Sequence, residues 1–188
     1  MTIQDEIIDL LKSTNRQGIE EFIDEMEMNG FFTAPCSGGN HLCKTGGLAE
    51  HSLNVCKTAM KMAQALEFEN MESVVIAALL HDYGKTGDYG KELYIDNVLK
   101  SGKVSTSKPF KRNPDILEKN HAVKSVVMIS RWFDLTEDEE FAILHHDGLY
   151  ERGNFEAWQN PTPLLMILHS ADLWCSRVIE KANESEDE

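Results

Sequence analysis

The most apolar stretch of this 188-residue chain ends in two polar residues, and this placement constrains the fold more than any other feature. Residues 74–80 are all hydrophobic, and His81 and Asp82 follow them directly. Such a run predicts a helix buried on every side, so an imidazole and a carboxylate stand where a core helix ends. Burying an unpaired carboxylate is unfavourable, and a metal ion is one of the few groups that compensate both side chains. A hydrogen-bonded core histidine is the alternative, and the dipeptide alone favours this simpler interpretation.

Hydrophobic residues recur at helical spacing along most of the chain. They predict helices over residues 3–11, 19–28, 48–66, 71–81, 121–133 and 164–182, and Thr136 is the predicted N-cap of a helix that reaches His145 and His146. Residues 31–47, 86–118 and 148–163 are rich in Gly, Pro, Ser and Asn, which predicts loops, with a short hairpin in the second. The sequence therefore predicts an all-α fold, a helical bundle with long irregular loops.

The composition is that of one globular domain over residues 1–188, with 41% hydrophobic and 27% charged residues and no shift between two halves. No apolar run approaches the roughly 20 residues of a membrane span, and the N-terminus lacks the basic and apolar parts of a signal peptide. We therefore expect a cytoplasmic protein with no membrane partner.

The formal net charge of −14, which includes an acidic tail at residues 183–188, argues against binding of long duplex nucleic acid. The main basic run lies in the loop at 86–118 and comprises Lys100, Lys103, Lys108, Lys111 and Arg112. This run is either a solvated loop or a substrate clamp, in which Phe110 would stack against a base.

Four cysteines form no CxxC pair, so we expect free thiols. Cys36, His41 and Cys43 lie close enough in the sequence to raise the hypothesis of a zinc knuckle. We do not favour it, because no fourth ligand follows at a familiar spacing.

Metal-capable side chains lie on or near the ends of the helices that should line the core. Seven of them on five segments are difficult to explain by packing alone: His51, His81, Asp82, His121, His145, His146 and Asp172. Two divalent ions a few ångströms apart can share a bridging hydroxide that attacks a phosphate ester, and an aspartate can bridge such ions with its two oxygens. Imidazole ligands suit Mn, Fe, Co, Ni or Zn better than Mg alone.

The ordered pattern of these residues resembles the HD-domain metal-dependent phosphohydrolase superfamily over residues 36–182. The motifs that carry the resemblance are His81-Asp82-Tyr83-Gly84-Lys85, His145-His146-Asp147-Gly148 and the stretch from Ile167 to Asp172. They are most similar to the HD domain of bacterial 3′–5′ exoribonucleases. The resemblance implies hydrolysis of a nucleotide, a short single-stranded oligonucleotide or another small phosphoester.

The resemblance also implies roles for individual residues. One metal would be held by His51, His81, Asp82 and Asp172, and Asp82 would bridge to a second metal held by His121, His145 and, as a further candidate, His146. Lys85 would lie by the substrate phosphate together with Asp82 at the catalytic centre, and His41 would lie near the site. Lys108, Lys111 and Arg112 are further candidates for substrate binding.

Two alternatives remain at the level of the sequence. Residues 1–30 are predicted as helices rather than as the OB fold that accompanies those exoribonucleases, and no GYP motif follows the paired histidines. A deoxynucleotide mono- or triphosphate hydrolase with one metal is one alternative, and a catalytically silent HD module used for binding or regulation is the other.

Overall fold

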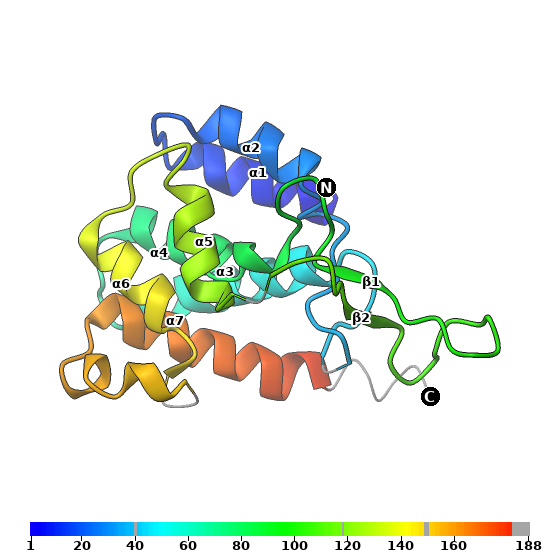
Figure 1. Ribbon diagram of the computed structural model, residues 1–188. Coiled ribbons are helices and arrows are strands. Elements are labelled where there is room, and N and C mark those ends of the chain that lie inside the picture. Colours follow the sequence, from blue (N-terminus) through cyan, green and yellow to red (C-terminus); the bar gives the residue numbers. More distant parts are fainter. Residues whose placement is uncertain (40, 118, 149–150, 182–188) are drawn as a thin grey trace.

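A computed structural model describes residues 1–39, 41–117, 119–148 and 151–181. Within these ranges the chain forms seven α-helices and one two-stranded sheet, so the predicted all-α fold is confirmed (Figure 1). The elements are α1 (Ile3–Ser13), α2 (Ile19–Met28), α3 (Gly47–Ala65), α4 (Met71–Leu80), β1 (Tyr94–Asp96), β2 (Phe110–Arg112), α5 (His121–Ile129), α6 (Glu137–His145) and α7 (Pro163–Trp174). The acidic tail at 183–188 lies outside the described residues.

Several helices begin at a polar residue whose side chain caps the helix. Thr2 and Thr136 form capping boxes with Asp5 and Glu139, so the predicted N-cap of α6 is confirmed. Asn70 accepts a hydrogen bond from the first turn of α4 in the same way. These local signals explain why the starts of the helices could be predicted closely.

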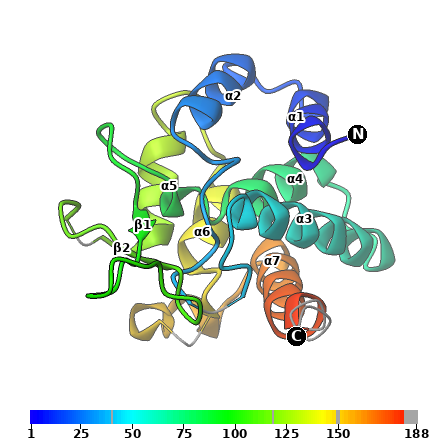
Figure 2. The ribbon, with the colours of Figure 1, turned by 90° about the vertical axis from the view of Figure 1, so that its right-hand side faces the viewer.

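The apolar helix α4 lies at the centre of the molecule, and every residue from 73 to 80 is buried. Helix α3 packs against both α4 and α7, whereas α1 and α2 lie on the side of the molecule opposite α7 (Figures 1 and 2). Burying a leucine or isoleucine side chain stabilises a fold by about 1.5–3 kcal/mol, so the run at 74–80 makes α4 a fixed support for the residues that follow it.

One of the predicted helices is too long, and another contains an irregular turn. Helix α5 ends at Ile129 rather than at 133, because the chain turns back and buries Phe133 against Phe22, with ring centroids 5.4 Å apart. Helix α7 ends at Trp174, and the chain stays helical through a π-helical turn, Cys175–Ile179, and through residues 180–181, so the predicted helix over 164–182 is confirmed as far as residue 181 but is not a regular α-helix throughout. None of the described helices combines the length and the hydrophobicity that crossing a membrane requires.

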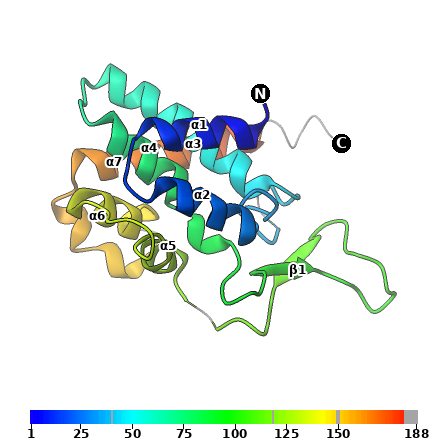
Figure 3. The same ribbon diagram turned by 90° about the horizontal axis from the view of Figure 1, so that it is seen from above.

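The excursion at 86–118 contains the predicted hairpin. Strands β1 and β2 are antiparallel, and the paired residues are Tyr94 with Arg112, Ile95 with Lys111, and Asp96 with Phe110. Figure 3 shows that this hairpin extends away from the helices.

A buried ion pair connects the α1–α2 connection to α6. Arg16 donates to both carboxylate oxygens of Glu139, over 2.8 and 3.1 Å, and Ser73 Oγ donates to the same carboxylate over 2.7 Å. Glu139 is fully buried. Burial raises the pKa of Glu139, but the hydrogen bonds from Arg16 and Ser73 outweigh it and hold this pKa below its ordinary value.

We expect Glu139→Gln to lower the free energy of unfolding by about 3 kcal/mol at neutral pH, because Arg16 loses its buried counter-ion. The lowered pKa of Glu139 means that its stabilisation is present above the unfolded pKa and is lost as the pH falls through the folded pKa. The difference between the two proteins should therefore shrink in strong acid. Urea unfolding at neutral and acidic pH measures both effects.

Glu140→Gln is the matched control, because Glu140 is exposed on the same turn of α6. It should change the free energy of unfolding by no more than about 0.5 kcal/mol. An equal loss in the two variants would contradict the role of the buried pair.

Candidate metal centre

Five segments bring imidazole and carboxylate groups to one place between the helices. The residue from α3 is buried, as are those from the end of α4, whereas those from α5 and α7 are partly exposed. The groups are His51 on α3, His81 and Asp82 after α4, His121 at the start of α5, His146 and Asp147 after α6, and Asp172 on α7. The cluster is therefore closed on its α4 side and reaches solvent on another.

The turn after α4 is fixed to α5 by one serine and one glycine. Gly84 donates its backbone N–H to Ser125 Oγ over 2.7 Å, and the same hydroxyl lies 2.7 Å from the His81 carbonyl oxygen. A Cβ atom on Gly84 would lie 2.1 Å from the carbonyl oxygen of His121, so no larger residue fits there. This close approach sets the position of Asp82 relative to His121.

The two oxygens of Asp82 face different histidines. Oδ2 lies 3.7 Å from His51 Nε2 and 3.5 Å from His81 Nε2. Oδ1 lies 3.3 Å from His121 Nε2 and 3.6 Å from His146 Nε2. One carboxylate thus stands between two sets of potential ligands.

Each set is completed by a second aspartate. In each set the potential ligand atoms lie within 4.8 Å of one another, and the two sets are His51 with His81 and Asp172, and His121 with His146 and Asp147. A third such group, His81 with Asp82 and His146, connects the two. Distances of this order suit side chains that share an ion.

Unpaired buried atoms converge on the same point. His51 Nε2, His81 Nε2 and Asp82 Oδ1 are buried without a hydrogen-bond partner, although each has charged or polar neighbours. Buried polar atoms without partners are rare, because each costs about 1–3 kcal/mol. The residues present therefore fit bound divalent ions, whose positive charge would satisfy these atoms.

The imidazole rings are oriented by contacts at their other nitrogen atom. His81 Nδ1 lies 2.9 Å from the Ala78 carbonyl oxygen, and His146 Nδ1 lies 2.8 Å from the Ile143 carbonyl oxygen. A carbonyl only accepts, so Nδ1 carries a proton in both rings, and Nε2 is the atom directed at the cluster, where its lone pair is available to an ion once the ring is neutral. Metal-binding histidines in proteins are commonly held in this way.

Glu180 holds His51 in the same manner, and the sequence did not single it out. Its carboxylate is fully buried and lies 2.9 Å from His51 Nδ1. In a regular helix Glu180 would lie about 80° around the axis from Asp172. The wider π-helical turn between them reduces this offset, and helical periodicity cannot foresee such a turn. Asp147 was also missed, because an aspartate beside two histidines is difficult to distinguish from a surface charge.

Two predicted residues lie outside the two sets. His145 Nδ1 lies 2.7 Å from Asn154 Oδ1, and its ring packs against Phe141, so His145 is directed away from the other histidines. His41 lies beside the cluster, with Nε2 3.5 Å from Glu180 Oε2 and 3.3 Å from Cys36 Sγ. A metal-capable group forms there from Cys36, His41 and His51, without the Cys43 of the hypothetical zinc knuckle.

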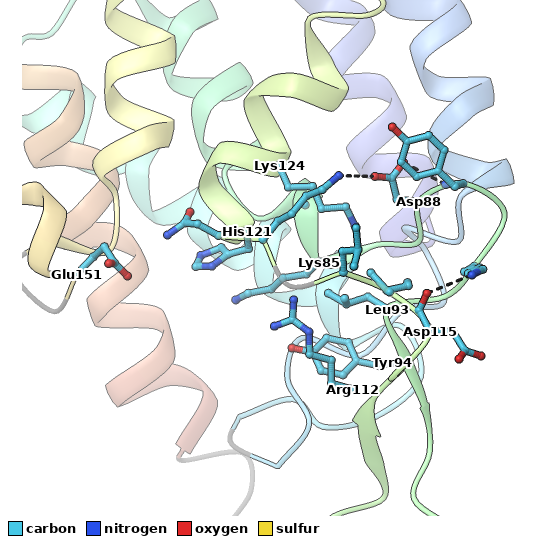
Figure 4. A pocket seen from close by; sticks show the side chains of 16 residues that line it. Lys85, Asp88, Leu93, Tyr94, Arg112, Asp115, His121, Lys124 and Glu151 are labelled. Carbon is cyan, nitrogen blue, oxygen red and sulfur yellow. Dashed lines mark hydrogen bonds and ion pairs between the residues drawn. The ribbon is translucent and has the colours of Figure 1, made fainter.

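Lys85 connects the cluster to an adjoining cavity. Its Nζ donates to Asp82 Oδ2 over 2.5 Å. Lys85 and His121 also line a cavity of about 620 Å³, which Arg112 lines as well (Figure 4). Lys108 and Lys111 do not line this cavity, and the side chain of Lys108 lies over Gly39 instead.

The charges in the cluster favour ionised carboxylates at neutral pH. Burial disfavours the charge on Asp82, but Lys85 and His81 outweigh it and hold the pKa of Asp82 well below its usual value. The pKa of Asp172 is also lowered, because the contact with His51 outweighs burial. Burial lowers the pKa of His121 to about 4, so this ring is neutral and can act as a ligand.

Comparison with known proteins gives the same identification as the sequence motifs. The model of the HD domain family matches residues 48–173. The chain is 26% identical over 167 residues to the 3′-5′ exoribonuclease YhaM of Listeria innocua, covering 87% of this chain and 49% of that protein. It is 29% identical over 168 residues to YhaM of Bacillus subtilis, covering 86% and 48%. The chain thus spans about half the length of these curated relatives, and no solved structure matches it.

We expect Glu180→Gln to raise the dissociation constant for Mn²⁺ about 10–100-fold, because His51 loses the charged group that orients its ring. Isothermal titration calorimetry measures the affinity, and circular dichroism in EDTA checks that the variant folds. Glu50→Gln is the control, because Glu50 neighbours His51 in sequence but pairs with Lys44 at the surface. Equal affinities for the wild type and Glu180→Gln would contradict this role.

Proposed function

Because this chain belongs to the HD domain family, we propose that it is a metal-dependent phosphohydrolase that cleaves a small phosphoester with two divalent ions. The observation that carries the proposal is the position of Asp82, whose two oxygens face two separate sets of histidines. Bound together, two divalent ions supply an activated water molecule and offset the negative charge of a phosphoryl group.

The proposed ligands divide into two sets that share Asp82. One ion would be held by His51, His81 and Asp172, and the other by His121, His146 and Asp147. The second set differs from the sequence-based expectation, because Asp147 takes the place expected for His145. The mixture of imidazole and carboxylate suits Mn, Fe, Co, Ni or Zn.

Lys85 would contact the substrate phosphate. Its ammonium group now contacts Asp82 Oδ2, an atom that a divalent ion would also use. Two cations cannot share this oxygen without strong repulsion, so the Lys85 side chain would turn into the cavity that it lines. There it would donate hydrogen bonds to phosphate oxygens and stabilise the charge that develops during hydrolysis.

A nucleotide or a short single-stranded oligonucleotide is the proposed substrate. The names of the YhaM relatives favour a ribonucleotide, and the acidic surface disfavours a long duplex. The runner-up function is hydrolysis of deoxynucleotides with one metal, and a silent HD module is the third hypothesis.

We expect elemental analysis to find two Mn²⁺ ions per wild-type chain after loading and desalting. Asp172→Asn and Asp147→Asn should each retain one ion, whereas Asp82→Asn should retain neither, because both sets lose their shared carboxylate. Asp9→Asn, an exposed change on α1, is the control and should retain two. One ion per wild-type chain would overturn the two-ion proposal in favour of the one-metal hydrolase.

We expect Lys85→Met to retain both ions and to lower kcat by about 10²–10³-fold, as for other groups that stabilise charge in a transition state. Hydrolysis of mononucleotides, cyclic dinucleotides and short oligonucleotides measures the rate. Loss of metal in this variant would instead assign Lys85 a structural role. A metal-loaded wild type without turnover on the whole panel would support the silent module.

A further inference from the structure

The cavity beside the cluster has the size of a small-molecule site. Its volume is about 620 Å³, within the range of about 300–1,000 Å³ that is usual for ligand pockets. Its walls come from the turn after α4, the hairpin and the start of α5 (Figure 4). Because Lys85 and His121 belong to both the cavity and the cluster, a ligand in the cavity would lie next to the proposed ions.

An aromatic ring and a guanidinium group lie together in this cavity. Tyr94 and Arg112 are direct partners in the β1–β2 ladder, so their side chains project from the same face of the hairpin. Figure 4 shows both side chains at the end of the cavity where Lys85 lies. Burial raises the pKa of Tyr94, so its hydroxyl stays protonated and its ring is partly shielded from water.

The charge of the cavity is opposite to that of the protein. Five cationic side chains line it, against three carboxylates, in a chain of net charge −14. The cations are Lys85, Lys91, Arg112, Lys119 and Lys124. One of the three carboxylates is already paired, since Asp88 Oδ2 lies 3.8 Å from Lys119 Nζ.

The cavity also has an apolar part. Leu93, Ile116 and Leu117 line it together with the Tyr94 ring. A bare phosphate or a small alkyl phosphate bound between Lys85 and Arg112 would leave these apolar side chains in contact with water. A ligand that matches the whole cavity therefore carries a negative charge and, next to it, a flat group that packs against the Tyr94 ring and the apolar side chains.

We infer that this cavity binds the nucleoside part of a nucleotide substrate, with the base stacked on Tyr94 and the phosphate held between Lys85 and Arg112. This inference rests on the proposed function and assigns the residues that bind the base and the phosphate of its substrate. Bases stack favourably on aromatic side chains, and a guanidinium group binds phosphate with paired hydrogen bonds.

The test compares two chromogenic diesters with the same leaving group, thymidine 5′-(p-nitrophenyl phosphate) and methyl p-nitrophenyl phosphate. Only the first carries a nucleoside, so the ratio of their kcat/KM values reports nucleoside binding. We expect Tyr94→Ala to lower this ratio about 10-fold, the effect of 1.4 kcal/mol of lost stacking. Tyr94→Phe retains the ring and should restore most of the ratio.

Arg112→Gln should raise KM for both diesters about equally, because the phosphate is common to them. Lys111→Gln is the matched comparison, since Lys111 precedes Arg112 but projects from the opposite face of β2. A smaller change in KM is expected for it. An equal effect of the two changes would show a general electrostatic clamp and would overturn the assigned role of Arg112.

The outcomes separate the two proposals. If the metal-loaded wild type hydrolyses neither diester nor any member of the nucleotide panel, the proposed phosphohydrolase function fails. If it hydrolyses nucleotides of the panel but not the thymidine diester, the nucleoside site as assigned is overturned. If it hydrolyses both and Tyr94→Ala leaves the ratio unaltered, or lowers both rates equally, the nucleoside site is overturned while the function stands. Circular dichroism of each variant checks that the fold is retained.

Discussion

The Asp82 carboxylate is almost completely buried, and the arrangement of the helices around it depends on how its charge is compensated. An isolated ionised carboxylate in the interior would cost many kcal/mol, so the fold has to supply cations or donors on every side. Lys85 supplies one, and His81 and His146 supply others. His51 on α3, His121 on α5 and His146 after α6 all lie beside this carboxylate. Three further segments are therefore arranged around one side chain, which the apolar helix α4 holds at the centre of the molecule.

This constraint explains why the sequence predicted where the candidate site lies but not which of two neighbouring histidines faces it. A carboxylate after an apolar run needs partners, and histidines at the ends of other core helices are the partners available to it. The sequence could not show whether His145 or His146 faces the cluster, because consecutive residues project about 100° apart and the rotation of α6 is set by packing. His146 is buried among the candidate ligands, whereas His145 contacts Asn154.

The ends of the helices were predictable where contacts between neighbours in the chain determine them. They were less predictable where packing of distant residues determines them. Thr136 could be identified as a cap from sequence, because a capping box involves only neighbours in the chain. The end of α5 depends on Phe133 reaching the core, a contact with Phe22 across more than 100 residues. The π-helical turn after α7 likewise brings Glu180 to His51, and no periodic pattern indicates it in advance.

In the basic excursion at 86–118, strand geometry places neighbouring basic residues on opposite faces of the hairpin, which the sequence alone does not show. Lys111 and Arg112 are neighbours in the chain, but successive residues of a strand project from opposite faces, and only Arg112 joins Tyr94 at the cavity. The helices thus carry the proposed metal ligands, while the hairpin carries Tyr94 and Arg112, the groups that we propose contact the rest of the substrate. Changes confined to β1 and β2 could alter which phosphoester enters without disturbing Asp82, because no residue of either strand belongs to the two ligand sets.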